Sequence, residues 1–159
     1  MEIKKLANNA LNFAINRAID IIGISIVIIG ILLLISLASF SPNDPNFIFP
    51  ENTEINNLLG FRGSFTADLF FQSFGLISLL VPFSLLFTGI NIILNKRILL
   101  LIESFFYIIL YILIGSLFFS FFYLNAFVLY INGNGGFIGQ YFVTTFLSSI
   151  VNINSNVSY

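Results

Sequence analysis

Residues 21–40 form an apolar run without a single charged side chain, interrupted only by Gly and Ser. A helix of this length rises about 30 Å, which is the thickness of the hydrocarbon core of a bilayer. A secretory signal peptide would have a shorter apolar core, of about 7 to 15 residues, followed by a small-residue cleavage site. Here Ser41-Pro42-Asn43-Asp44 follows instead. The run therefore predicts a transmembrane helix.

The composition of the 159-residue chain extends this conclusion to the whole molecule. Charged residues make up 8% of the chain and hydrophobic residues 58%, whereas a soluble globular protein is roughly 25% charged. So few polar side chains cannot cover a globule in water, and the apolar groups must therefore face lipid. A water-soluble fold is excluded, and the length allows one domain.

Two further apolar runs, at residues 69–94 and 98–124, are each long enough to cross a bilayer with some tilt. Only Asn95-Lys96-Arg97 separates them, which predicts an antiparallel helical hairpin. Pro82 is expected to kink the first of these two spans. The sequence thus predicts an all-α, polytopic transmembrane protein with three spans and an outer loop after the first.

The basic residues predict the orientation of these spans. Only one of the six Lys and Arg residues, Arg62, lies in the loop after the first span. The other five precede the first span or mark the tip of the hairpin: Lys4, Lys5, Arg17, Lys96 and Arg97. Because basic residues are enriched on the cytoplasmic side, the N-terminus and the hairpin tip are expected inside and the loop outside.

Residues 1–20 place apolar side chains at helical spacing, opposite a polar side with Lys5 and several Asn. This pattern predicts a cytoplasmic helix at the membrane interface. We expect it to extend the first span along the lipid headgroups, in preference to a dedicated partner-binding helix. Residues 21–159 then make up the membrane domain.

The region after residue 124 contains a glycine-rich stretch, Asn132 to Gly136, that predicts a turn. Residues 137–153 are short for a span and include Gln140, Thr144 and Thr145. We expect an interfacial or re-entrant helix there, with a fourth span as the alternative. The absence of Lys and Arg after it favours an outer position for residues 154–159.

The residues that most enzymes use are missing from this chain. It contains no His and no Cys, so a triad base, a thiolate nucleophile and the usual zinc ligands are absent. No G-x-x-x-x-G-K-[ST] phosphate loop occurs, which argues against an ATPase. With a net charge of −1 there is no field to attract nucleic acid. We predict no catalytic, cofactor or metal site, and no direct nucleic-acid binding.

Ionisable residues inside a membrane are functional candidates, so each needs an interpretation. Asp68 is expected to open the second span as a helix cap, Asp20 to pair with Arg17, and Glu103 to reach the interface or pair with Arg97. None of these residues lies near the midplane, which argues against proton-coupled transport.

Other polar and small residues of the spans give weaker signals. Ser116 and Ser120 place small groups on one helix face, which lets another helix approach, and Asn91 is expected to form an interhelical hydrogen bond. Four polar residues in the second span are too scattered to indicate an aqueous path: Ser78, Ser84, Thr88 and Asn91.

Five short motifs occur in order along the chain, from the end of the first span onward. They comprise a proline-rich stop, an N-x-x-G-x-x-G string, an Ala-Asp pair, a Phe-Gly pair and a G-G-x-I-G string. Their residues are Ser41, Pro42, Asp44, Pro45, Asn57, Gly60, Gly63, Ala67, Asp68, Gly75, Gly135, Gly136, Ile138 and Gly139. Together they resemble the N-terminal membrane region of the FtsK/SpoIIIE DNA translocases.

The resemblance implies a bacterial inner-membrane anchor for a translocase that acts in cell division and chromosome segregation. It implies lipid, further copies of the chain and septal division proteins as partners, and a motor domain that follows in the family but not in these 159 residues. Ser64 departs from the Ala usual in the family. Where the family continues into a last span and a motor, this chain ends at Tyr159, which favours a truncated frame, a fragment or a split protein. The competing interpretation is a small transporter or channel subunit.

Overall fold

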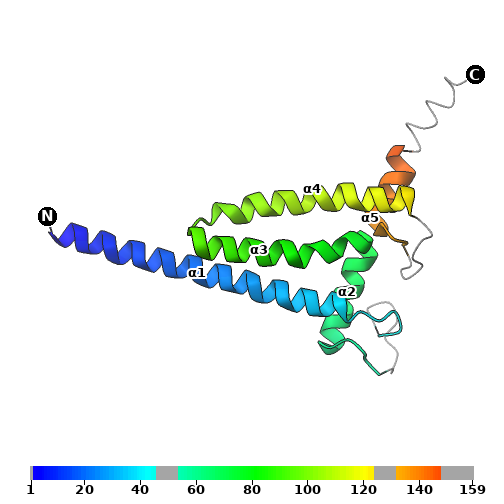
Figure 1. The fold of residues 1–159 in the computed structure, drawn as a ribbon, viewed down its shortest axis with the longest axis horizontal. Coiled ribbons are helices and arrows are strands. Elements are labelled where there is room, and N and C mark those ends of the chain that lie inside the picture. Colours follow the sequence, from blue (N-terminus) through cyan, green and yellow to red (C-terminus); the bar gives the residue numbers. More distant parts are fainter. Residues whose placement is uncertain (1, 46–53, 124–131, 148–159) are drawn as a thin grey trace, which may run out of the picture.

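The computed structural model describes residues 2–45, 54–123 and 132–147, and all elements within these ranges are helical. Figure 1 shows three long helices side by side, with shorter helices at one end of the bundle. The α-helices are α1 (Glu2–Ala38), α2 (Gly60–Phe74), α3 (Leu80–Asn95), α4 (Leu99–Phe122) and α5 (Gly136–Phe142). A 3-10 helix, η1 (Gly75–Leu79), joins α2 to α3, and a π-helix, η2 (Val143–Leu147), follows α5.

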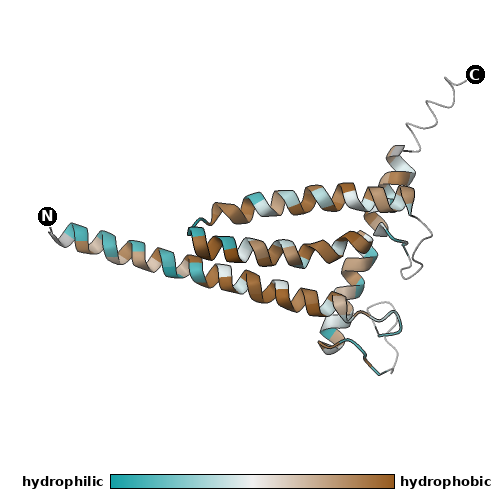
Figure 2. Ribbon diagram, in the orientation of Figure 1, coloured by the Kyte–Doolittle hydropathy of each residue, from teal (hydrophilic) through white to brown (hydrophobic). Residues whose placement is uncertain are grey.

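Among the described residues, three stretches are long and apolar enough to cross a membrane: Lys4–Ala38, Gly60–Asn95 and Leu99–Phe122. Large apolar side chains remain exposed along all three, among them Ile28, Phe87 and Phe105. The most hydrophobic parts of α1, α3 and α4 lie next to one another, at the same level of the bundle (Figure 2). The predicted all-helical membrane protein with three spans is confirmed.

Helix α1 has 37 residues and is therefore about 55 Å long, well beyond one bilayer core. Its N-terminal part projects past the other helices (Figure 1), and the side chains from residue 4 to residue 18 are all exposed. From Glu2 onward, the helix predicted at residues 1–20 is thus continuous with the first span. Its place at the membrane interface stays a prediction.

Close backbone approach holds α1 against α3. A Cβ on Gly89 would lie 2.7 Å from the carbonyl oxygen of Gly23 and 2.6 Å from Cγ2 of Val27. Because Gly23 and Gly89 have no side chains, α1 and α3 come nearer to each other than larger residues would allow, as is common between membrane helices. The apolar core continues from this contact through Leu33 and Leu37 toward α2 and α4.

Helices α3 and α4 form the predicted antiparallel hairpin (Figure 1). Lys96 ends α3 in the left-handed region, at φ 53°, and its N–H donates to the carbonyl of Ile92 at 2.9 Å. Its ammonium group pairs with Asp20 of α1, which also pairs with Arg17 at 3.2 Å. The predicted Arg17–Asp20 pair is confirmed. Through Lys96, this pair is linked to the tip of the α3–α4 hairpin at residues 95–98, which is called the hairpin end of the bundle here.

The second span differs from its predicted course. Residues 69–74 belong to α2, which runs across the end of α1, and the chain bends at Gly75 before α3 begins (Figure 1). Pro82 lies in the first turn of α3, where few backbone N–H groups have an intrahelical partner. The expected kink at Pro82 is therefore wrong, and the bend lies seven residues earlier.

Candidate functional site

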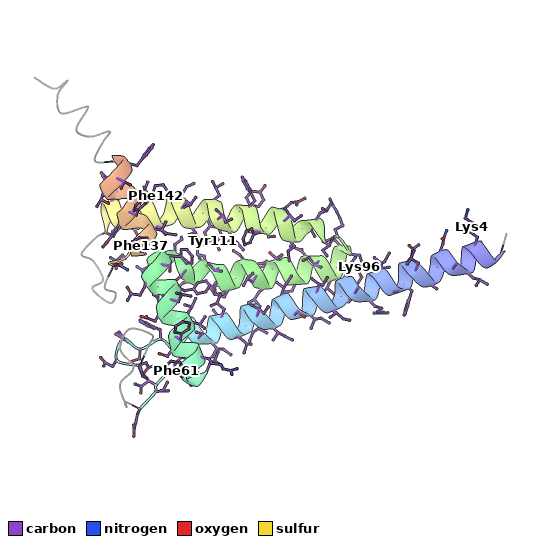
Figure 3. The ribbon with its side chains drawn as sticks, turned by 180° about the vertical axis from the view of Figure 1, so that it is seen from behind. Lys4, Phe61, Lys96, Tyr111, Phe137 and Phe142 are labelled. Atoms are coloured by element: carbon purple, nitrogen blue, oxygen red, sulfur yellow. The ribbon has the colours of Figure 1, made fainter. Side chains whose placement is uncertain are left out.

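The motif residues, although spread over almost one hundred positions, gather at one end of the bundle. This end, called the α2 end here, comprises the end of α1, the turn into α2, α2 itself, η1 and α5 (Figure 1). Figure 3 shows Phe61 on α2 and Phe137 on α5 at this end, with Lys96 at the opposite one.

Asp44 fixes the loop after α1. Its Oδ2 accepts a hydrogen bond from the backbone N–H of Asn57 at 2.9 Å, and its Oδ1 accepts from the backbone N–H of Asn56 at 2.9 Å. The Asp44 side chain is only 4% exposed. A carboxylate that accepts several N–H groups makes charge-assisted bonds, which are stronger than neutral ones. Asp44 thus ties the two ends of the loop together.

Asn57 connects this loop to the end of α1. Its Nδ2 donates to the carbonyls of Ser36, at 2.9 Å, and Ser39, at 3.3 Å. The last carbonyls of a helix have no intrahelical partner, so this amide satisfies two acceptors near the end of α1. Its Oδ1 also accepts from the N–H of Leu59 at 3.1 Å, which shapes the turn into α2.

Gly60 and Gly63 serve this turn in different ways. Gly60 has φ +64°, which favours glycine, while a Cβ there would meet nothing within 4 Å. Gly63 is an ordinary helical residue, but a Cβ there would collide with Oδ1 of Asn57 and lie 2.6 Å from Cβ of Leu59. A positive φ is therefore required at Gly60, whereas Gly63 is required for the space that its missing side chain leaves.

The buried face of α2 carries Ser64, Ala67, Asp68 and Phe71. Asp68 lies well inside α2, so the prediction that it caps the second span is wrong; Gln72 Nε2 donates to its Oδ1 at 3.5 Å. Ser64 Oγ donates to the carbonyl of Pro45 at 3.0 Å. The Ser that departs from the family pattern therefore bonds α2 to the proline-rich stop.

The loop before α5 closes the bend at Gly75. Gly75 has φ +70°, and a Cβ there would lie 2.5 Å from the carbonyl carbon of Asn134. The N–H of Leu76 donates to the carbonyl of Asn134 at 2.8 Å. Asn132 Nδ2 adds a bond to the carbonyl of Gln72 at 3.3 Å. The predicted turn at Asn132–Gly136 is confirmed.

Helix α5 rests on the small residues of α4. A Cβ on Gly135 or Gly139 would collide with Oγ of Ser120 and with the carbonyl of Ser116. Ser116 Oγ donates to the carbonyl of Phe74 at 2.9 Å. The prediction that Ser116 and Ser120 admit a close helix is confirmed. The described part of the predicted 137–153 helix ends at residue 147, so its course beyond lies outside the described residues.

Two grooves flank the contact between α3 and α4. One, of about 370 Å³, has an apolar lining that includes Phe74, Leu85, Phe105 and Ile138. The other, of about 230 Å³, has a mainly apolar surface, and Ser84, Thr88 and Asn91 are among the residues that line it. These three residues therefore lie closer together than predicted. Ser78 lies apart from it, buried and bonded to the carbonyl of Gly75 at 2.7 Å.

The hydrogen bonds and close glycine contacts of the α2 end join its helices and loops to one another. Within the described ranges, no three His, Cys, Asp or Glu side chains lie close enough together to hold a metal ion. The Asn91 side chain forms no interhelical hydrogen bond with the described residues, so that expectation is wrong within these ranges. Ser84 and Tyr111 form such a bond between α3 and α4, with their oxygens 3.1 Å apart. Glu103 is exposed and forms no ion pair with any residue that the structure describes.

Comparison with protein families identifies the family to which the chain and these motifs belong. The family described as the 4TM region of DNA translocase FtsK/SpoIIIE matches residues 16–157, which includes every motif residue above. The chain belongs to the FtsK/SpoIIIE 4TM family. It is accordingly a multi-pass membrane protein that corresponds to the membrane-anchor region of FtsK and not to its motor domain.

Curated FtsK relatives match in part. The chain is 36% identical to the DNA translocase FtsK of Rickettsia bellii over 64 residues, which is 40% of this chain and 8% of that protein. It is 30% identical to the DNA translocase FtsK of Azospirillum brasilense over 88 residues, or 54% of this chain and 14% of the relative. The match thus spans a small fraction of these relatives' length. No solved structure matches the chain.

Proposed function

We propose that this chain anchors an FtsK-like DNA translocase in the bacterial inner membrane and gathers at the division septum, where its copies self-associate and contact division proteins. The N-terminus and the hairpin end face the cytoplasm. This segment performs no catalysis and binds no nucleic acid itself. Its role is to hold a translocase at the division septum, where chromosomes are segregated and the septum closes.

The observation that supports this proposal is the family match over residues 16–157. The relatives are named DNA translocases, and the matching family is described as the 4TM region of such translocases. The charge distribution supports the orientation, since five of the six basic residues flank the ends assigned to the cytoplasm. Exposed Leu58 and Phe61 offer an apolar contact for a division protein at the α2 end.

A fluorescent fusion at the N-terminus tests the septal role. The fusion is expected to gather at midcell in dividing cells. A matched variant, Gly63→Val, disrupts the turn into α2 and should lose the midcell band while it stays in the membrane fraction. An even distribution of the wild-type fusion around the envelope would contradict the proposal and favour a small transporter.

A further inference from the structure

A third groove, of about 460 Å³, is lined by residues of α1, α2 and α3 and by the turn into α2 (Figure 1). Its lining is mainly apolar and includes Ile29, Leu32, Phe70 and Leu85. Among the described residues that line it, only Arg62 carries a charge. The volume falls within the range of about 300 to 1,000 Å³ that is typical of small-molecule sites. The groove therefore combines an apolar surface with a single cation.

The positions that line the groove cover the depth of one membrane leaflet. Ser36 lies toward the α2 end, where its Oγ donates to the carbonyl of Gly63, next to Arg62, at 2.6 Å. Ile29 lies close to the middle of the apolar run at residues 21–40. At 1.5 Å per residue, Ile29 and Ser36 are about 10 Å apart along α1. One leaflet contributes about 15 Å of hydrocarbon, so an acyl chain can follow this lining from the level of Arg62 to the midplane.

Arg62 has no partner among the described residues. Its side chain is exposed and forms neither an ion pair nor a hydrogen bond with them. Only its backbone carbonyl is bonded, to the hydroxyl of Thr66 at 2.7 Å. A cation at the edge of an apolar surface loses part of its hydration, and this cost is offset when an anion binds it. The guanidinium group is therefore available to an anion at the membrane surface.

The chemistry of a guanidinium group favours a phosphate as this anion. Its planar fork of N–H groups matches two oxygens of a phosphate at once, and these charge-assisted hydrogen bonds are stronger than neutral ones. A phospholipid carries its phosphate directly above its acyl chains. An apolar groove of leaflet depth with Arg62 at its surface end repeats this order of groups.

The apolar groove between α3 and α4 differs in one respect. Its lining includes Phe105, Ile109 and Leu113, and no charged residue is among the described residues that line it. Acyl chains can fill that groove, but it offers nothing that distinguishes one headgroup from another. It therefore serves as an internal control for contact with bulk lipid.

We propose that the groove between α1, α2 and α3 binds one anionic phospholipid, with an acyl chain along Ile29, Leu32 and Leu85 and the phosphate on the guanidinium of Arg62. No carboxylate lines the groove among the described residues, so a lipid with a headgroup amine gains no partner for its ammonium group there. The site goes beyond the proposed function and does not depend on where in the cell the chain gathers.

Native mass spectrometry tests the headgroup preference. The full chain is placed in nanodiscs with equal amounts of phosphatidylglycerol and phosphatidylethanolamine, and the retained lipid is identified. The wild type should retain phosphatidylglycerol about fivefold over the amine lipid, the ratio expected for one basic residue at a membrane surface. Arg62→Gln should abolish this preference and Arg62→Lys should keep most of it. Arg97→Gln, an exposed basic residue at the hairpin end, is the matched control and should behave as the wild type. No preference in the wild type, or the same preference in Arg62→Gln, would overturn the proposal.

Photolabelling locates the lipid in the folded wild-type chain. Phosphatidylglycerol with a diazirine in its acyl chain, in vesicles with the full chain, should label Ile29, Leu32 or Leu85. Unlabelled phosphatidylglycerol should compete with this labelling about fivefold better than phosphatidylethanolamine, whereas labelling of Phe105 and Ile109 should respond equally to both competitors. An equal response in both grooves would mean that only bulk lipid fills them and would refute the site. Midcell gathering is scored separately, so its loss would count against the proposed function and not against this site.

Discussion

Asp44 Oδ2 accepts a hydrogen bond from the backbone N–H of Asn57 at 2.9 Å, across thirteen positions of the chain. The two side chains are each 4% exposed. This bond helps to hold Asn57 in place, and the side-chain Nδ2 of Asn57 donates to the carbonyls of Ser36 and Ser39. One carboxylate thus determines how α1 ends and how the chain returns toward α2.

Asp44→Ala should destabilise the α2 end because it leaves the buried N–H of Asn57 without its acceptor. The cost of such an unpaired group is about 1 to 3 kcal/mol. Asp44→Asn keeps one acceptor oxygen, so its stability should lie between that of the wild type and that of Asp44→Ala. Unfolding midpoints in detergent titrated with sodium dodecyl sulfate measure the order. The neighbour Asn43 is exposed, so Asn43→Ala is the control, and an Asp44→Ala midpoint equal to that of the control would contradict this account.

Gly60 and Gly63 should respond differently to the same substitution. Gly60→Ala places a side chain at φ +64° but in open space, and costs about 1 to 2 kcal/mol. Gly63→Ala forces a Cβ against Asn57 and should cost more, since either the amide or the turn must move. Gly60→Asn should be close to wild type, because Asn tolerates positive φ. The same unfolding titration ranks the three variants; equal losses from both Ala variants would show that backbone strain governs both positions.

The lengths of the apolar runs were enough to predict the spanning part of α1, the α3–α4 hairpin and its tip, and the helical spacing of residues 1–20 predicted the rest of α1. They could not show the bend at Gly75, because Phe74 and Leu76 on either side continue the apolar pattern. The contact that closes this bend comes from Asn134, far along the chain. The hydrogen bond between Ser84 and Tyr111 is not predicted from the sequence for a related reason. Ser84 and Tyr111 meet only in the register that the hairpin sets, which the sequence does not display.

Gly89→Leu should separate α1 from α3. Its side chain would have to displace the backbone of α1 near Gly23, because the Cβ alone would lie 2.7 Å from that carbonyl. Overpacking of this kind costs about 1 to 3 kcal/mol, and the loss of close contact adds to it. The unfolding midpoint should fall accordingly. Ile90→Leu, at a position 46% exposed, should leave it unchanged; a comparable fall in both variants would mean that α3 does not pack through Gly89.

The orientation of the chain can be tested with an impermeant maleimide in spheroplasts. Leu58, 78% exposed at the α2 end, should react as Leu58→Cys in intact spheroplasts, because the positive-inside rule places that end outside. Asn95→Cys at the hairpin end should react only after lysis. Phe87→Cys lies about 12 Å into the membrane from the end of α3 and should stay unlabelled in both conditions, since the reagent attacks a thiolate that needs water. This third variant shows that labelling reports aqueous exposure and not general reactivity. If Asn95→Cys reacts in intact spheroplasts and Leu58→Cys does not, the N-terminus and the hairpin end lie outside, and the proposed orientation is wrong.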